Sequence, residues 1–285
     1  MSSVVADGFT MVAQTRLWNV WAIESEYTQY QSYFTTQALD FLDAMTTQME
    51  TDFGFTPTIP AGGSYDGVHF DVILDPASQG GAHTGTVFGS YGVSVSPDSI
   101  YNVYSGVTGF WWYILTLHET ANVFTGVIAQ GWPWADGSIL WSGTSPFPGM
   151  CEPVILSEIG MTNVATLDYA RLASDPLFLL IYNMQKTFGW KLYQGLFSNV
   201  QKFAISWYNY TEPLRTATLI FFMSVAAGQN LLPKFNSAGI VVTQAELTSA
   251  ASAFPSLVLP PLPAITSGIS VGAIFVALVV FANLL

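Results

Sequence analysis

The stretch WWYILTLHETANVFTGVIAQGWPWADG occupies residues 111–137 and decides how the rest of the chain is interpreted. Its first twenty residues are mostly apolar, and Gly131 and Pro133 follow them, which is a typical helix stop. The pattern therefore predicts a long helix over 111–130. His118, Asn122 and Thr125 share one face of that helix, beside an apolar stripe of Leu117, Ala121 and Phe124.

The letters HETAN, residues 118–122, resemble the pattern H-E-x-x-H of zinc peptidases. In that pattern two imidazoles four residues apart reach one zinc ion, and the glutamate after the first histidine activates the metal-bound water. Here His118 and Glu119 keep their places, but Asn122 replaces the second histidine. A neutral amide oxygen is a poorer zinc ligand than imidazole, so we expect weak zinc affinity unless another group compensates. A satisfied polar pair on an ordinary helix is the alternative.

Patterns on both sides of this helix predict an α+β fold with a small mixed sheet and a mostly helical C-terminal half. Residues 15–52 carry apolar side chains at near-helical spacing, which predicts one or two helices. Alternating and β-branched segments predict strands at 68–75 and 92–96. A Gly-rich hairpin lies between them, and residues 131–149 form a predicted loop. Further helices are predicted at about 152–159, 176–188, 190–202, 213–227, near 231 and 244–253.

The charge balance of the 285-residue chain excludes one class of partner. Nineteen acidic residues face seven basic ones, which gives a formal net charge of −12 without any Lys/Arg cluster. Nucleic acids require basic side chains to neutralise their phosphates, so we expect no nucleic-acid partner. Cys151 is the only cysteine. A zinc site would therefore use mainly histidine, carboxylate or amide ligands.

The C-terminus differs from the rest of the chain. A Pro-rich linker at 254–263 precedes an uncharged apolar run at 264–285. The length of this run suits a membrane span or the removable tail of a lipid-anchor signal. It predicts membrane association through the tail and an extracellular or cell-surface location, which the sequon at Asn209 also suits. A buried C-terminal helix is the alternative, because no signal peptide is recognisable at the N-terminus.

Two downstream segments add a family resemblance. QKTFGWKLYQGLFSNVQ (185–201) and MSVAAGQNLLPKFNSAGIVVT (223–243) follow the HETAN helix in the same order as in enhancin-like, mucin-directed zinc metallopeptidases of the gluzincin clan, which this chain resembles. The resemblance implies a zincin-like N-terminal half at 1–130 and a helical half at 131–253 that completes the cleft. Protein or glycoprotein substrates, or ligands, are implied as partners.

The same resemblance implies roles for individual residues. His118 would be the first zinc ligand and Glu119 the catalytic general base, while Asn122 stands at the second ligand. The third ligand of the family is a glutamate, for which Asp136, Glu152 and Glu158 are the candidates. If zinc is bound, the reaction is peptide hydrolysis; if it is not, the chain is an inactive pseudopeptidase that binds proteins or glycans. A structural surface protein with an accidental motif is the third possibility.

Aromatic and histidine side chains near the motif leave further alternatives open. Trp132, Trp134 and Trp141 crowd the loop after the helix and are candidates for stacking on sugar rings, or for sealing the core between the two halves. His69 lies on the first predicted strand. His83 lies in the Gly-rich hairpin, from which it could approach a metal, although a surface position is the simpler expectation.

Overall fold

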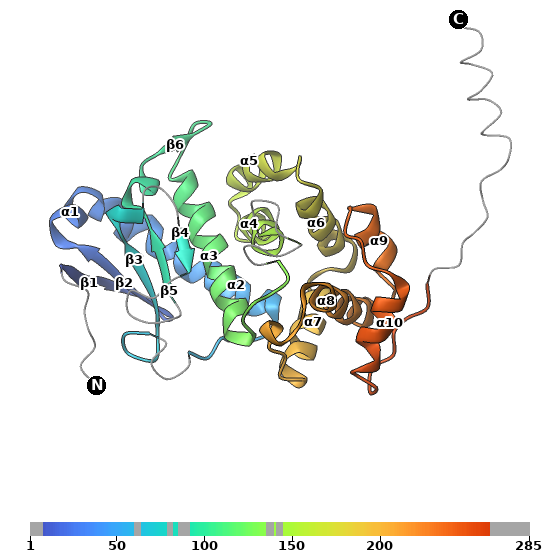
Figure 1. Cartoon of the computed structure of the whole chain (residues 1–285). Coiled ribbons are helices and arrows are strands. Elements are labelled where there is room, and N and C mark those ends of the chain that lie inside the picture. The colour runs from blue at the N-terminus through green and yellow to red at the C-terminus, as the bar shows by residue number, and fades with distance from the viewer. Residues whose placement is uncertain are drawn as a thin grey trace, which may run out of the picture.

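The computed structural model describes residues 8–59, 64–78, 82–84, 92–134, 140 and 145–262. These residues form an α+β structure in which helix α3 (Phe110–Ile128) separates a sheet from a group of helices (Figure 1). The sheet and helix α1 lie on one side of α3, helices α4–α10 lie on the other, and α2 reaches past α3 to contact α4 and α7. The predicted α+β class, with a small mixed sheet and a mostly helical C-terminal half, is therefore confirmed for the described residues.

The sheet is mixed and has five strands in the order β1-β2-β3-β5-β4. Strands β2, β3 and β5 run parallel, whereas β1 and β4 pair antiparallel at the two edges. The central strands β2, β3 and β5 are buried along most of their length, as expected for parallel strands covered on both faces. The strands are β1 (Phe9–Gln14), β2 (Trp18–Ile23), β3 (Phe70–Leu74), β4 (Ala82–Thr84) and β5 (Gly92–Val95).

The prediction of helices over 15–52 was wrong in its first part. Residues Trp18–Ile23 form the central strand β2 because this segment pairs with β1 on one side and with β3 on the other. Helix α1 (Glu24–Tyr33), the π-helical turn η1 (Phe34–Ala38) and helix α2 (Leu39–Phe53) follow as one nearly continuous helical segment. Helix α2 then ends at Gly54, whose φ of 75° closes the helix in the left-handed region.

Helix α3 begins after two short connecting elements and packs against both halves. The 3-10 turn η3 (Pro97–Ile100) and the hairpin of β6 (Val103–Tyr104) and β7 (Val107–Thr108) lead into it. Gly109 precedes α3 at a φ of 72°, and a Cβ there would lie 2.5 Å from the Tyr33 hydroxyl oxygen. The helix contacts β4 and β5 on one side and α4 on the other. Its position therefore joins the sheet to the helical half.

The helical half agrees with the predicted helices in all but two places. Helix α4 starts at Pro146, inside the predicted loop, and α5 was not predicted at all. Helices α6 and α7 begin and end where the sequence pattern placed them. The helices are α4 (Pro146–Glu158), α5 (Thr162–Leu172), α6 (Pro176–Phe188), α7 (Trp190–Lys202), α8 (Glu212–Ala227), α9 (Leu232–Ser237) and α10 (Gln244–Ser252), with 3-10 turns η2 (Pro76–Ser78) and η4 (Trp207–Asn209).

One continuous hydrophobic core runs through the described residues. Aromatic rings fill the region where the two halves meet: Phe53 of α2 contacts Phe124 of α3, Phe147 of α4 and Phe197 of α7. Within the described ranges, none of the helices is both long enough and apolar enough to cross a bilayer. The predicted tail at 264–285 lies outside the described residues, as does most of the Gly-rich hairpin.

Candidate functional site

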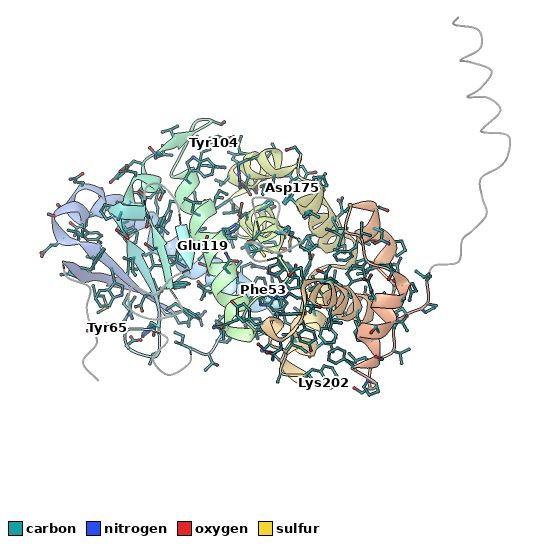
Figure 2. All side chains as sticks on the ribbon, viewed as in Figure 1. Phe53, Tyr65, Tyr104, Glu119, Asp175 and Lys202 are labelled. Carbon is teal, nitrogen blue, oxygen red and sulfur yellow. The ribbon has the colours of Figure 1, made fainter. Side chains whose placement is uncertain are left out.

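Helix α3 carries the HETAN residues at the centre of the molecule. Leu117, Ala121 and Phe124 are completely buried, which orients the neighbouring polar residues. The His118 side chain is 18% exposed, so it is not enclosed in a packed core. Figure 2 shows Glu119 on the part of α3 that lies between the sheet and the helical half. The helix therefore presents this polar strip where the two halves of the fold meet.

Asn122 bonds to the residue that the motif predicts to be a general base. Its amide nitrogen Nδ2 donates a hydrogen bond of 3.1 Å to Oε2 of Glu119. The two side chains are one helical turn apart, a spacing at which side-chain pairs meet on a helix surface. The substitution at the fifth motif position thus has a local partner, and it occupies one oxygen of Glu119.

His118 contacts a carboxylate from the helical half. Its Nδ1 lies 2.5 Å from Oε1 of Glu152, which is on α4 and whose side chain is only 2% exposed. Burial lowers the pKa of His118, so we describe the contact as a neutral imidazole donating Nδ1–H to the carboxylate. This tautomer leaves Nε2 with its lone pair. The structure therefore brings together His118 and one of the three proposed third ligands.

Arg171 provides a positive charge beside the buried carboxylates of Glu152 and Asp168. It contacts the Glu152 oxygen that His118 does not contact. Its Nη2 donates to Oε2 of Glu152 at 2.8 Å and to Oδ1 of Asp168 at 2.7 Å. Its Nε donates a further bond of 3.0 Å to the same Asp168 oxygen. The guanidinium carbon lies 5.6 Å from the centroid of the Trp111 ring on α3. A single arginine on α5 is thus held by groups from α3, α4 and α5.

The pKa values of the two carboxyls show how this cluster is charged. Burial raises the pKa of Glu152 to about 7, against the opposing effect of Arg171. Burial and the adjacent Glu152 raise the pKa of Asp168 to about 9. The two buried carboxyls therefore resist ionising together, and Arg171 compensates the negative charge that they carry. We infer that the His118–Glu152–Arg171–Asp168 cluster needs no metal ion to balance its charge.

These donors fit a zinc site poorly. The motif supplies one imidazole instead of two, and both oxygens of Glu152 already accept hydrogen bonds. Within the described part of the chain, no three His, Cys, Asp or Glu side chains are grouped so that they could hold a metal. Asp136, another proposed ligand, lies outside the described residues.

Glu158, the remaining proposed ligand, belongs to a different cluster. It accepts a hydrogen bond of 3.1 Å from Nε1 of Trp190 and also lies beside Asp52 of α2. Of the three carboxylates that the sequence left open, only Glu152 is shown in contact with His118.

The proposed sugar-binding tryptophans lie mainly in the core. Trp132 and Trp134 are 3% and 1% exposed, and their rings stack on each other with centroids 4.6 Å apart. Trp134 stacks in turn on Phe147 of α4. These buried faces favour the alternative that the rings seal the core between the two halves. Trp141 lies outside the described residues.

The other two histidines are not shown near His118. His69 Nδ1 lies 2.7 Å from Asp66 Oδ2, just before β3. His83 is on β4 and pairs with Ser94 of β5, and its side chain is outside the described part.

A cavity of about 190 Å³ opens elsewhere on the helical half. It lies between α4, α5 and α6 and is lined by Pro153, Ser157, Thr162, Ala165, Thr166, Tyr169, Tyr182 and Lys186. None of the HETAN residues contributes to it. We place the candidate site at α3 because His118, Glu119 and Asn122 meet Glu152 there, although this cavity lies elsewhere.

Sequence reasoning missed Asp168 and Arg171 because helix α5 itself was not predicted. The signal that could have found them is the spacing D-x-x-R at 168–171, which puts an acid and a base on one face of a helix. That spacing is common on helix surfaces. Only the tertiary structure shows that this pair is directed at Glu152.

Comparison with known proteins supports the fold alone. No family model matches the chain, and no curated protein matches it. Two crystal structures described as a functionally unknown conserved protein from Bacillus anthracis and a mutant of it are similar, with TM-scores of 0.55 and 0.56 at 14% and 12% identity. The matches cover 87% of this chain and 51% and 52% of those chains, so this chain spans about half their length.

Proposed function

We propose that this chain is a catalytically inactive member of the zincin-like folds, related to the enhancin-like metallopeptidases, that acts as a protein- or glycoprotein-binding module. The observation that carries the proposal is the bond from Asn122 to Glu119. The residue at the second ligand position is hydrogen-bonded to the residue at the general-base position. Asn122 therefore does not act as a zinc ligand, and Glu119 is not positioned as the base for a metal-bound water.

The strand order and the place of α3 support the fold part of this proposal. An edge strand, β4, runs antiparallel to the sheet and contacts the helix that carries His118 and Glu119. A helix from the second half then delivers a glutamate to His118. This arrangement supports the expectation of an N-terminal half that carries the motif and a helical half that completes the site. Location at the cell surface, with the apolar run at 264–285 as its anchor, remains part of the same proposal.

An active metallopeptidase is the second candidate, and one observation favours it. Histidines that bind metals commonly donate their other ring N–H to a carboxylate, as His118 does to Glu152. The free Nε2 is then available for a metal. Asn122 and the engagement of Glu119 weigh against this candidate, because they remove one imidazole and one carboxylate oxygen from the reaction.

Metal analysis of the full chain separates the two candidates. The protein is freed of metal with a chelator, dialysed and titrated with zinc in a calorimeter, and its peptidase activity is measured on a casein substrate. We expect neither tight one-to-one zinc binding nor zinc-dependent hydrolysis. A variant with Glu119→Gln is the matched control, because it abolishes catalysis by an active zinc site and changes nothing in an inactive one. Tight zinc with Glu119-dependent hydrolysis contradicts the proposal.

A further inference from the structure

We propose that Arg171 is a built-in cation that takes the electrostatic place of a divalent metal in the polar cluster beside His118, and that it keeps metal out. This inference rests on the proposed function, because it explains how a fold of that kind holds its inward-facing carboxylates without zinc. Arg171 is therefore a positioning residue: it holds Glu152 in place, and Glu152 in turn holds the imidazole of His118.

The contacts of Arg171 show that its charge is directed into the cluster. It makes one hydrogen bond to Glu152 and two to Asp168, all between 2.7 and 3.0 Å. The two carboxylate side chains are 2% and 0% exposed, whereas Arg171 is 24% exposed. Water therefore screens these acids poorly, and the guanidinium is the permanently charged group that contacts both of them.

The helices fix this arrangement. Asp168 and Arg171 are three residues apart on α5, so they face the same side of that helix. Helix α4 packs against both α3 and α5 and carries Glu152 between His118 and Arg171. The Trp111 ring of α3 lies against the guanidinium, where it provides a cation–π contact. The position of Arg171 is thus determined from three helices.

The chemistry of arginine explains why this cation excludes a metal. Its guanidinium is permanently charged and donates hydrogen bonds, but it has no lone pair with which to ligate a metal. A divalent ion approaching Glu152 would meet a fixed positive charge and would have to compete for an oxygen that already accepts from Nη2. Restoring the second imidazole at position 122 is therefore insufficient for tight binding while Arg171 is present.

The test is a zinc titration of four forms of the full chain: unaltered, Asn122→His, Asn122→His with Arg171→Met, and Asn122→His with Arg171→Lys. Zinc alone is the probe. We expect no measurable binding by the unaltered chain and weak binding by Asn122→His. Adding Arg171→Met should increase zinc affinity by about 100-fold, because it removes a positive charge that repels the ion from Glu152. Arg171→Lys should change affinity by only a few-fold, because lysine keeps the positive charge.

Folding is followed by circular dichroism in every case. If the Arg171→Met double variant is unfolded without metal, we expect zinc to restore its folded signal, since binding free energy then adds to folding free energy. A double variant that neither binds zinc when folded nor folds when zinc is added overturns the inference.

Two further results separate this inference from the proposed function. Equal, tight zinc binding by Asn122→His and by its Arg171→Met derivative overturns the role of Arg171 and leaves the proposed function standing. Tight one-to-one zinc binding by the unaltered chain overturns the proposed function itself, because the chain would then need no restored histidine.

Discussion

The carboxyl group of Asp52 provides a quantitative test of the electrostatics at the junction of α2, α4 and α7. Asp52 is 5% exposed, and Gln48 donates to each of its carboxylate oxygens at 3.1 Å. Burial and a hydrogen bond with Glu158 raise the pKa of Asp52 to about 8. The pair thus shares a proton in the folded protein. We predict that Asp52→Asn stabilises the protein at pH 8 and removes part of the pH dependence of its stability.

The stability effect of Asp52 depends on how its pKa differs between the folded and unfolded protein. An unfolded aspartate loses its proton near its ordinary value of 3.8, whereas the folded Asp52 retains it up to about pH 8. The stabilisation that the protonated Asp52 gives to the folded protein is thus fully present below pH 3.8 and is lost as the pH rises through 8. A shift of about four units corresponds to about 5 kcal/mol at most. Because Glu158 shares the proton, we expect half of this stabilisation, about 2–3 kcal/mol.

Asparagine suits this position for a geometric reason. Its oxygen can accept the hydrogen bond from Gln48, and its NH₂ group can donate to Glu158 in place of the shared proton. Melting temperatures should be measured at pH 5 and pH 8. At pH 8 the variant should melt roughly 5–10 °C above the unaltered protein, and at pH 5 the difference should be much smaller. Asp43→Asn, an exposed site on the same helix, is the control for loss of one charge. Equal effects of the two variants at both pH values would refute the reasoning.

Three further predictions concern packing and the tail. Gly195→Ala should destabilise the protein by about 1–3 kcal/mol in chemical denaturation, because its new Cβ would lie 2.6 Å from Cβ of Ala226 and force α7 away from α8. Gly149→Ala is the matched control, since its nearest atom is 3.7 Å away, and a loss as large as that of Gly195→Ala would contradict this account. In the same assay, Trp134→Ala should lower the free energy of unfolding by about 3–5 kcal/mol. A small loss would instead indicate a ring that serves mainly to bind a ligand. Removing residues 264–285 should leave the circular dichroism and melting temperature of the protein unchanged and should abolish its partition into detergent. If the truncated chain is unfolded, the segment belongs to the core.

The helical half was largely predictable from sequence because each helix carries its own start and stop signals. Asp175 caps α6, and Pro176 occupies its first turn, while Gly189 separates α6 from α7. Such signals are local, so the bounds of α6 and α7 were predicted without knowledge of the tertiary structure. Helix α5 has no side-chain cap at Met161 and a modest apolar face, which explains why it was missed.

Strand β2 could not be recognised for the opposite reason. Strand β2 is buried over nearly its whole length, so its apolar side chains do not alternate with polar ones. A short apolar run of this kind does not distinguish a buried strand from a helix segment. Only its pairing with β1 and β3 determines that it is a strand.

The candidate site shows the same division between local and long-range information. His118, Glu119 and Asn122 were identified from their spacing alone, because four residues make about one helical turn. Glu152 remained one of three carboxylates, since its contact with His118 spans 34 positions of the chain. The contribution of Arg171 depends on how α5 packs on α4, which no local pattern in the sequence encodes.

The stacked indoles of Trp132 and Trp134 give the protein an optical signal of its own. Their ring planes differ by 5° at a centroid separation of 4.6 Å, so their electronic transitions should couple and produce a paired band in the circular dichroism spectrum. The stack is extended by Phe147 of α4, at the junction between α3 and the helices that follow it. Loss of the packing against Phe147 would change the environment of this indole pair and hence its band, which makes the junction observable without an added label.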